Sequence, residues 1–352
     1  MQAIGSTRLP VTVITGFLGS GKTTLLRHLL QNSGRRLAVL VNEFGEVGID
    51  GALLRSCGIC EDETAVVELA NGCLCCTVQD DFLPTMQTVL ERADQLDGIV
   101  IETSGLALPE PLLQAFNWPE IRHRTRVSGV VSVVDGQALS QQRVVFDSDA
   151  LEQQRANDPS LDHEDAIEDL FLEQLEVADL VLISRADLLS SSELEQARVQ
   201  LQKQFEQLPI ENNPPHLSIQ RGVIDPALVL GLDRAAPVSA DQVDGDDHHH
   251  HHHDHSHPDL MATCVELQGS WERDAVESLI RKTIRSMGLI RMKGRVPIAG
   301  KSLPLQVQAV GSRIECWYEK DGGSPDQLQL VLIGDHPDGA MLQGQLEELM
   351  LG

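Results

Sequence analysis

The first residues whose types and spacing suggest chemistry form the segment GFLGSGKT, from Gly16 to Thr23. It matches G-x-x-x-x-G-K-[ST] in full, follows the apolar run VTVIT and precedes the helix-like run TTLLRHLL. Glycines let the backbone turn its N–H groups toward phosphates, and the helix directs its positive end to the same place. We expect Lys22 to reach the β- and γ-phosphates and the Thr23 hydroxyl to ligate Mg²⁺. The predicted nucleotide-binding residues here are Gly16, Gly19, Ser20, Gly21, Lys22, Thr23 and Thr24.

A second segment, LVLISRAD, indicates which base is read. Its apolar run ends in Ser184, Arg185 and Asp187, and all three are predicted nucleotide-binding residues. A carboxylate at the mouth of a strand can accept hydrogen bonds from N1 and N2 of guanine, donors that adenine lacks. GTPases usually carry Lys where this chain has Arg185, whose aliphatic stem can still pack on the base. Taken alone, the segment is also compatible with an ordinary strand-ending turn.

Two glutamates follow other apolar runs. Glu43 lies in VNEFGEVGID, and Glu102 lies in GIVIETSG, where a Walker B carboxylate usually orients Mg²⁺ and its water. We assign both, with Lys22, to the catalytic set, and both, with Thr23, to the Mg²⁺ site. Gly105 is expected to donate its N–H to the γ-phosphate, a contact that hydrolysis would release. A solvated strand end is the alternative for each glutamate.

Three cysteines, Cys73, Cys75 and Cys76, fall within four residues in ELANGCLCCTV. Thiolates bind borderline and soft divalent ions such as Zn²⁺ and Co²⁺, and the Asn71-Gly72 turn could gather several of them. Cys57 and Cys60 form a second close pair that could complete or protect the site. Buried, inert thiols are the alternative.

Eight of the 13 histidines stand close together after the acidic segment DGDD, namely His248 to His253, His255 and His257. Such a run binds Ni²⁺, Co²⁺, Cu²⁺ or Zn²⁺ through imidazoles. The surrounding residues 233–258 are low in complexity and are predicted to form a flexible linker that loads or buffers metal, or that has no metal role.

The remaining patterns predict the elements that must position these groups. Apolar runs typical of buried parallel strands alternate with helix-like stretches through the first two-thirds of the chain, which predicts an open α/β sheet flanked by helices. After the linker, strands and two helices predict a small α+β domain. We therefore expect three parts: a P-loop GTPase domain over 1–232, the His-rich linker over 233–258 and the second domain over 259–352. The expected strands are Leu9–Thr15, Leu37–Asn42, Ala65–Leu69, Gly98–Thr103, Val127–Val134, Leu180–Ser184 and Leu217–Gln220.

Composition narrows the classes of partner. The net charge of −26, from 27 basic and 53 acidic residues, repels phosphate backbones and anionic membranes, so nucleic acid and membranes are not expected partners. No apolar run reaches the roughly 18 residues of a membrane helix, and the first residues lack a signal-peptide pattern. We expect a cytoplasmic protein whose seven cysteines are thiols or metal ligands.

Together these segments resemble the CobW-type GTPases, a metal-chaperone branch of the P-loop GTPases. The matching residues are ITGFLGSGKTTLL, NEFGEVGID, ELANGCLCC, ETSGLALPEP, VVSVVDG and SRADLL, and the segments GCLCCTVQDDFLPTM and AFNWPEIRHR are most similar to the members associated with aerobic cobalamin biosynthesis. The resemblance implies a cycle in which Mg²⁺ and GTP order the switch loops, the C-x-C-C thiolates capture a divalent metal, and hydrolysis releases it. It also implies cobalt as the cargo and a metal-receiving protein such as cobaltochelatase.

Three alternatives remain open from the residues alone. A zinc chaperone of the same family is one, because Zn²⁺ stands above Co²⁺ in the affinity series. An ATP-dependent small-molecule kinase is another and would prefer ATP to GTP. A passive metal store is the third and would depend on His248 to His257.

Overall fold

The computed structural model describes residues 8–41, 66–68, 82–147, 149, 151, 166–208, 214–230, 260–319 and 326–350, with the backbone alone for 66–68. The chain divides into two compact units, Met1–Leu232 and Asp233–Gly352. No helix within these ranges is both long enough and apolar enough to cross a membrane.

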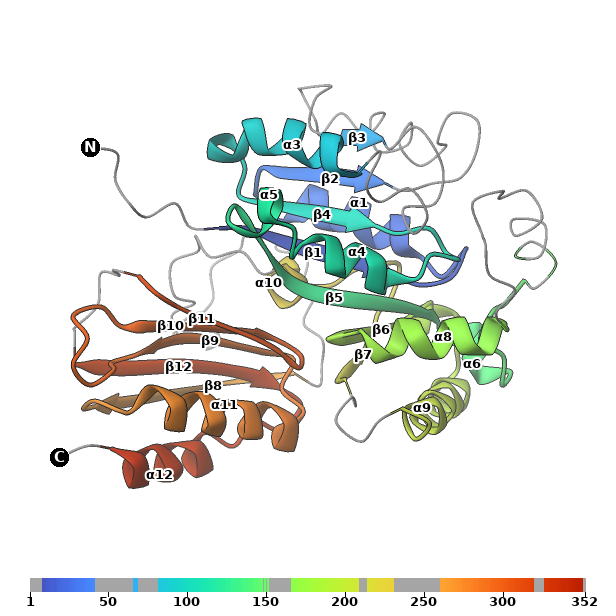
Figure 1. Cartoon of the computed structure of the whole chain (residues 1–352). Helices are drawn as coiled ribbons and strands as arrows, with labels where there is room; N and C mark the ends of the chain where they lie inside the picture. Colours follow the sequence, from blue (N-terminus) through green and yellow to red (C-terminus); the bar gives the residue numbers. More distant parts are fainter. Residues whose placement is uncertain are drawn as a thin grey trace, which may run out of the picture. The chain divides into compact units, whose positions relative to one another are not determined.

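The first unit is built on a seven-stranded sheet in which every neighbouring pair is parallel, in the order β3-β2-β4-β1-β5-β6-β7 (Figure 1). The predicted mostly parallel α/β sheet is confirmed. The long apolar runs become strands because both faces of the sheet are covered, and β1 and β2 are buried at every residue. The strands are β1 Leu9–Thr15, β2 Leu37–Val41, β3 Val66–Glu68, β4 Gly98–Glu102, β5 Thr125–Asp135, β6 Leu180–Ser184 and β7 His216–Ser218.

Helices cover both faces of this sheet. Figure 1 shows α1 behind the sheet and α4 in front of it. One apolar cluster joins α3, α4 and α5 to β1, β2 and β4, and a second joins α6, α8 and α9 to β5 and β6. The helices are α1 Lys22–Asn32, α3 Leu83–Glu91, α4 Pro109–Ala115, α5 Pro119–Arg122, α6 Gly136–Ser140, α8 Ile167–Glu176, α9 Ser191–Phe205 and α10 Pro226–Val229, with 3-10 turns η2 Ala93–Gln95 and η3 Ala186–Leu188.

The strand order places the phosphate loop where chain direction across the sheet changes. From the central β1, the chain continues to β2, β3 and β4 on one side and to β5, β6 and β7 on the other. In open parallel sheets, ligands bind at the carboxyl ends of the strands beside such a switch point. The loops after β1, β4 and β6, which carry most of the candidate residues, therefore open at one edge.

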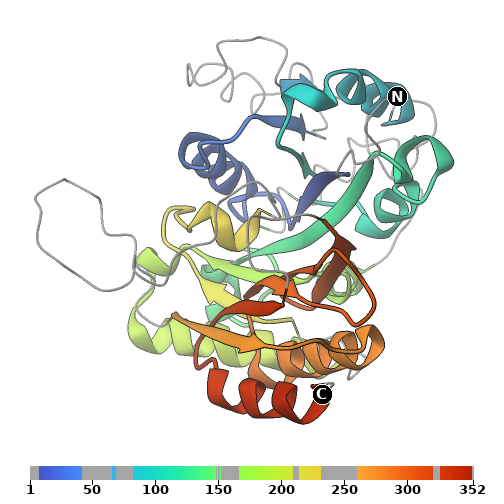
Figure 2. The same ribbon diagram turned by 90° about the vertical axis from the view of Figure 1, so that its left-hand side faces the viewer.

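The second unit is an antiparallel five-stranded sheet, ordered β11-β10-β9-β12-β8, with α11 and α12 packed on one face (Figures 1 and 2). The predicted second α+β domain is thereby confirmed as a fold class. Trp271 is fully buried, and its indole N–H donates to the Leu346 carbonyl at 2.7 Å, which ties α12 to the start of α11. The elements are β8 Met261–Gln268, α11 Arg273–Met287, β9 Arg291–Val296, β10 Leu305–Val310, β11 Arg313–Tyr318, β12 Gln327–Gly334 and α12 Gly339–Leu349.

Candidate functional site

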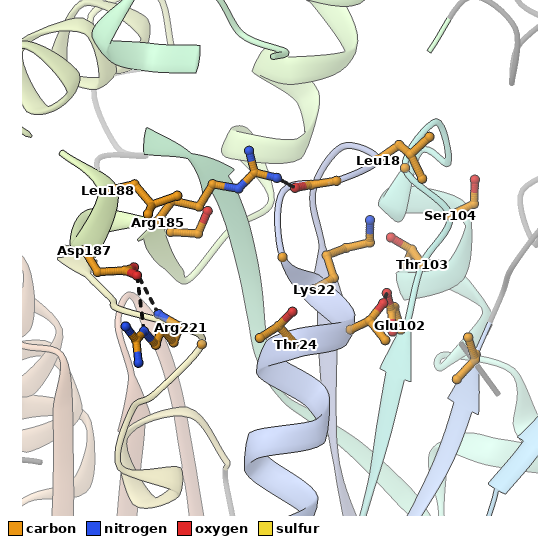
Figure 3. Close-up of a pocket in the computed structure, with 17 residues that line it drawn as sticks. Leu18, Lys22, Thr24, Glu102, Thr103, Ser104, Arg185, Asp187, Leu188 and Arg221 are labelled. Carbon is orange, nitrogen blue, oxygen red and sulfur yellow. Dashed lines mark hydrogen bonds and ion pairs between the residues drawn. The ribbon is translucent and has the colours of Figure 1, made fainter. Parts of the chain in front are cut away.

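A pocket of about 560 Å³ opens at the carboxyl edge of the first sheet (Figure 3). Its lining comes from the phosphate loop and α1, from the ends of β2, β4 and β6, and from the turn that follows β7. The lining residues are Leu18, Gly19, Gly21, Lys22, Thr23, Thr24, Val41, Glu102, Thr103, Ser104, Gly105, Ser184, Arg185, Asp187, Leu188, Arg221 and Gly222. The structure thus brings most of the predicted nucleotide-binding residues into one pocket, although they come from three distant segments.

The phosphate loop is shaped by glycines in backbone conformations that other residues rarely adopt. Gly16, Gly19 and Gly21 have φ values of 136°, 75° and 104°. A Cβ on Gly16 would lie 2.2 Å from the Val133 carbonyl oxygen, so this position also needs its missing side chain for close packing on β5. Gly16 and Ser20 shape the loop but do not line the pocket, and Ser20 is buried.

Lys22, Thr23 and Glu102 form the polar group beside this loop. Lys22 is buried and donates from Nζ to the Phe17 carbonyl at 3.1 Å, which holds its ammonium inside the loop. The Thr23 hydroxyl donates to Glu102 Oε1 at 3.0 Å, and Glu102 is 5% exposed at the end of β4. A hydroxyl and a buried carboxylate at this distance are oxygen donors of the kind that Mg²⁺ prefers.

Gly105 lies against the phosphate loop. A Cβ there would approach the Leu18 nitrogen to 2.5 Å, so the two backbones are in close contact. The Gly105 carbonyl accepts a hydrogen bond from Gln174 Nε2 of α8 at 3.1 Å. The segment after Glu102 is therefore positioned beside the loop, where the sequence predicts a switch contact.

The opposite end of the pocket is formed by β6 and the turn after β7. Asp187 follows β6 in η3 and accepts from the Arg221 backbone N–H at 3.3 Å and from Arg221 Nε at 3.4 Å (Figure 3). Arg221 and Gly222 both have positive φ, 51° and 73°, and Val223 N–H closes the turn on the Gln220 carbonyl at 2.8 Å. Ser184 is buried at the end of β6, where a Cβ on Gly21 would lie 3.7 Å from the Ser184 Cβ.

Arg185 spans the two ends of the pocket. Its Nη2 donates to the Gly19 carbonyl at 2.6 Å, and its Nη1 pairs with Asp135 Oδ2 at 2.8 Å. Arg185 therefore contacts the phosphate loop directly. The sequence predicts only that its aliphatic stem packs on the base.

Several residues of the site are absent from the sequence-based prediction, and one of them, Asp135, binds Arg185 without lining the pocket. Asp135 ends the apolar run of β5, the same signal that identified Glu102 at the end of β4. Arg221 and Gly222 follow a strand of only three residues, and no motif marks the turn between them. Their part in the pocket follows from the parallel pairing of β7 with β6, which a single sequence does not show.

The predicted metal ligands lie mostly outside the described residues. Glu43, the cysteines Cys57, Cys60, Cys73, Cys75 and Cys76, and the histidines from His248 to His257 belong to this part of the chain. Within the described ranges, no three His, Cys, Asp or Glu side chains gather as a metal site.

The two described cysteines are poor thiolate donors at neutral pH. Burial raises the pKa of Cys316 to about 11. Burial and the nearby Glu266 raise the pKa of Cys264. Because the thiolate is the metal-binding form, neither residue is favoured as a ligand.

Both units of the chain match known proteins. Residues 10–211 match the family model described as CobW/HypB/UreG, nucleotide-binding domain, and residues 261–350 match the Cobalamin synthesis protein cobW C-terminal domain. The chain is 40% identical over 338 residues to the Zinc chaperone CobW of Sinorhizobium sp, covering 94% of this chain and 93% of the relative. It is 42% identical over 353 residues to the Zinc chaperone CobW of Pseudomonas aeruginosa, covering 96% and 91%. A third relative, the Zinc-regulated GTPase metalloprotein activator 1 of Dictyostelium discoideum, is 35% identical over 201 residues, covering 53% and 42%. The chain therefore belongs to the CobW/HypB/UreG family.

Proposed function

We propose that this protein is a GTP-hydrolysing metallochaperone that binds a divalent metal at Cys73, Cys75 and Cys76 with Mg²⁺-GTP bound and releases it after hydrolysis. The observation that carries the proposal is a single pocket with a phosphate loop at one end and Asp187 at the other. The names of the two relatives that match more than 90% of this chain support the metal-chaperone part.

Guanine is the base that Asp187 favours. Its two carboxylate oxygens already accept two parallel donors, the backbone N–H and Nε of Arg221. A carboxylate has about four lone-pair sites, so it can also accept N1–H and N2–H of guanine. Adenine would leave the carboxylate facing an acceptor, which opposes an ATP-dependent kinase.

Mg²⁺ fits the residues beside the phosphate loop. Thr23 Oγ1 and the Glu102 carboxylate would supply oxygen ligands, and Glu43 is proposed to join them or to position a water. When bound, Mg²⁺ would neutralise charge that develops on the phosphate oxygens. Lys22 would stabilise the same charge, and Gly105 would bind the γ-phosphate through its N–H.

Sheet topology gives the proposed coupling a short path. The Cα of Val41 pairs with that of Glu102 on one side and that of Glu68 on the other. Glu43 lies two residues after Val41, and Cys73 lies five residues after Glu68. Because five residues span at most roughly 18 Å, chain length alone limits how far Cys73 can lie from Glu68. A γ-phosphate that orders these loops could therefore change the geometry of the thiols.

Zinc is the proposed cargo. The sequence resemblance favours cobalt and delivery to cobaltochelatase, and both stay predictions. Zn²⁺ binds thiolates more tightly than Co²⁺, and the two relatives that match nearly the whole chain are named zinc chaperones. We propose that the recipient is a zinc-dependent protein.

Metal titrations in defined nucleotide states test this function. Dissociation constants for Zn²⁺ and Co²⁺ would be measured with Mg²⁺ and either a non-hydrolysable GTP analogue or GDP. We expect at least about tenfold tighter Zn²⁺ binding with the GTP analogue, which corresponds to about 1.4 kcal/mol of coupling. Equal constants in both states would contradict the proposal, because a ligand without state preference shifts nothing.

Three variants identify the metal site. Replacing Cys73, Cys75 and Cys76 by serine should abolish the nucleotide-dependent difference, whereas replacing Cys264 by serine should preserve it. Deleting 248–257 should also preserve it, and loss of most metal binding in that deletion would instead support a passive store. A switch of preference to Co²⁺ in the GTP state would restore cobalt as the cargo.

A further inference from the structure

The guanidinium of Arg185 contacts groups from three separate segments. Its Nη1 pairs with Asp135 Oδ2 at 2.8 Å and lies 3.4 Å from Gln137 Oε1, and its Nη2 donates to the Gly19 carbonyl at 2.6 Å. The Phe146 ring lies against it, 5.8 Å from Cζ to the ring centroid. A planar guanidinium can make these directed bonds simultaneously, whereas the ammonium of lysine is a single point of charge.

Asp135 is the fixed partner in this arrangement. Its side chain is 6% exposed, against 33% for Arg185, and stands at the end of β5. Its Oδ1 accepts from the Gln137 and Ala138 backbone N–H groups at 2.8 and 3.2 Å, which caps α6 and fixes the carboxylate plane. Because Oδ1 is occupied by the helix, Oδ2 remains directed toward Arg185.

Arg185 is held in an uncommon backbone conformation. Its φ is 57°, one of three positive values at non-glycine residues in the described part of the chain. Such a conformation is strained for a residue with a side chain and persists where surrounding contacts determine it. The contacts to Asp135 and Gly19 hold Arg185 in this conformation. They also connect the segment that carries Asp187 to the phosphate loop.

We propose that Asp135 is a positioning residue of the nucleotide site, which orients Arg185 so that it fixes the Gly19 carbonyl and the shape of the phosphate loop. This inference rests on the proposed function only in taking the pocket as the GTP site. It also gives a reason for arginine at a position where lysine is usual, since its two Nη groups bind Asp135 and Gly19 through a planar fork that lysine lacks.

Loss of Asp135 should affect nucleotide affinity differently from loss of Asp187. Asp187 is expected to read the base, so its loss should alter GTP more than ITP, whose hypoxanthine lacks the 2-amino group. The Asp135–Arg185 pair shapes the loop that holds phosphates, which both nucleotides share. Loss of Asp135 should therefore weaken GTP and ITP equally.

The test uses Asp135→Asn in the full chain, because the amide oxygen can still cap α6 while the negative charge is lost. Dissociation constants for GTP and ITP should each rise about tenfold, the equivalent of one lost charge-assisted hydrogen bond, with the GTP-to-ITP ratio unchanged. Asp338→Asn is the matched control, because Asp338 caps α12 in the other unit by accepting from Met341 N–H at 2.9 Å. Nucleotide affinity in that variant should equal the wild-type value.

A double-mutant cycle separates positioning from a structural role. If Asp135 acts through Arg185, Asp135→Asn should add nothing to the loss caused by Arg185→Ala. Additive losses, or a lower melting temperature with unchanged nucleotide affinity, would overturn the inference. Failure of the wild-type chain to bind GTP would instead remove the proposed function, so the two failures are distinguishable.

Discussion

The phosphate end of the pocket positions its groups mainly through backbone conformation, whereas the base end relies on side chains that hold one another. Gly16, Gly19 and Gly21 reach positive φ at no steric cost. At the base end, Arg185 and Arg221 adopt positive φ despite their side chains, and each pairs with an aspartate. The phosphate end is thus a contiguous segment, while the base end joins Asp187 to Arg221, 34 positions apart along the chain.

This difference indicates which positions of the pocket should tolerate substitution. A loop set by backbone conformation fails when a Cβ is added, since a side chain at Gly16 would meet Val133. An arrangement set by ion pairs fails in steps, because breaking an exposed pair costs only about 0–1 kcal/mol, whereas removing one partner of a buried pair costs more by leaving an unpaired charge. Substitutions at the two ends should therefore differ in size and in which nucleotide feature they affect.

The largest effect is expected from Lys22→Ala at the phosphate end. Lys22 is buried, and its ammonium is held in the loop by the Phe17 carbonyl. Loss of charge-assisted bonds to two phosphates should weaken GTP binding by about 100-fold or more. Calorimetric titration should show an equal loss for ITP. A selective loss for GTP would contradict a purely phosphate-binding role.

A somewhat smaller effect is expected for Glu102→Gln, and it should appear in turnover. The amide oxygen can still accept the Thr23 hydroxyl bond, now 3.0 Å, but the negative charge that favours Mg²⁺ is lost. The steady-state hydrolysis rate should fall by about 100-fold, with a smaller change in GTP affinity. Glu120→Gln on α5, which is exposed and does not line the pocket, is the control and should hydrolyse GTP at the wild-type rate.

Asp187→Asn should change base preference more than phosphate binding. Asparagine offers one acceptor and one donor group, so it suits xanthine, whose C2 carbonyl replaces the guanine amine. We expect GTP affinity to fall by about 10- to 50-fold and XTP to become the preferred nucleotide. Competition binding with GTP, XTP and ATP measures this, and an unchanged GTP preference would show that Asp187 does not read the base.

The smallest effect is expected for Arg221→Gly. Its side chain is 85% exposed, so the contact between Nε and Asp187 should contribute about twofold or less to the GTP-to-ITP ratio. Glycine also relieves the positive φ, so the free energy of unfolding should change by less than about 1 kcal/mol. Gln142→Gly gives a matched comparison, since Gln142 has φ 60° and does not line the pocket. A fall in the GTP-to-ITP ratio in both variants would remove Arg221 from base recognition.

The contrast between the two ends also explains how far sequence reasoning reaches. The phosphate loop, Glu102 and the parallel sheet can be predicted from local signals. The strands of this sheet are apolar runs, and the phosphate loop and Glu102 stand at the ends of two of them. The helices α4, α5, α6 and α10 are short, at four to seven residues, and carry too few turns for a periodic pattern.

Asp135 and Arg221 meet the segment after β6 only because of the strand order. β5 and β7 flank β6 in the sheet, and this pairing brings both residues toward the loop after β6. The ends of apolar runs identify candidate strands, but a single sequence does not state which of them are neighbours. The same limit applies to Arg185, whose identity is visible while its bond to Gly19 is not.

The coupling of nucleotide to metal is tested most directly in a single turnover. The chain would be loaded with Zn²⁺ and Mg²⁺-GTP, then mixed with excess zinc-responsive chelator while phosphate release is followed in parallel. Transfer of zinc to the chelator should follow phosphate release with the same rate constant and should stop with a non-hydrolysable analogue. Zinc transfer at one rate regardless of nucleotide or hydrolysis would contradict a chaperone cycle driven by GTP.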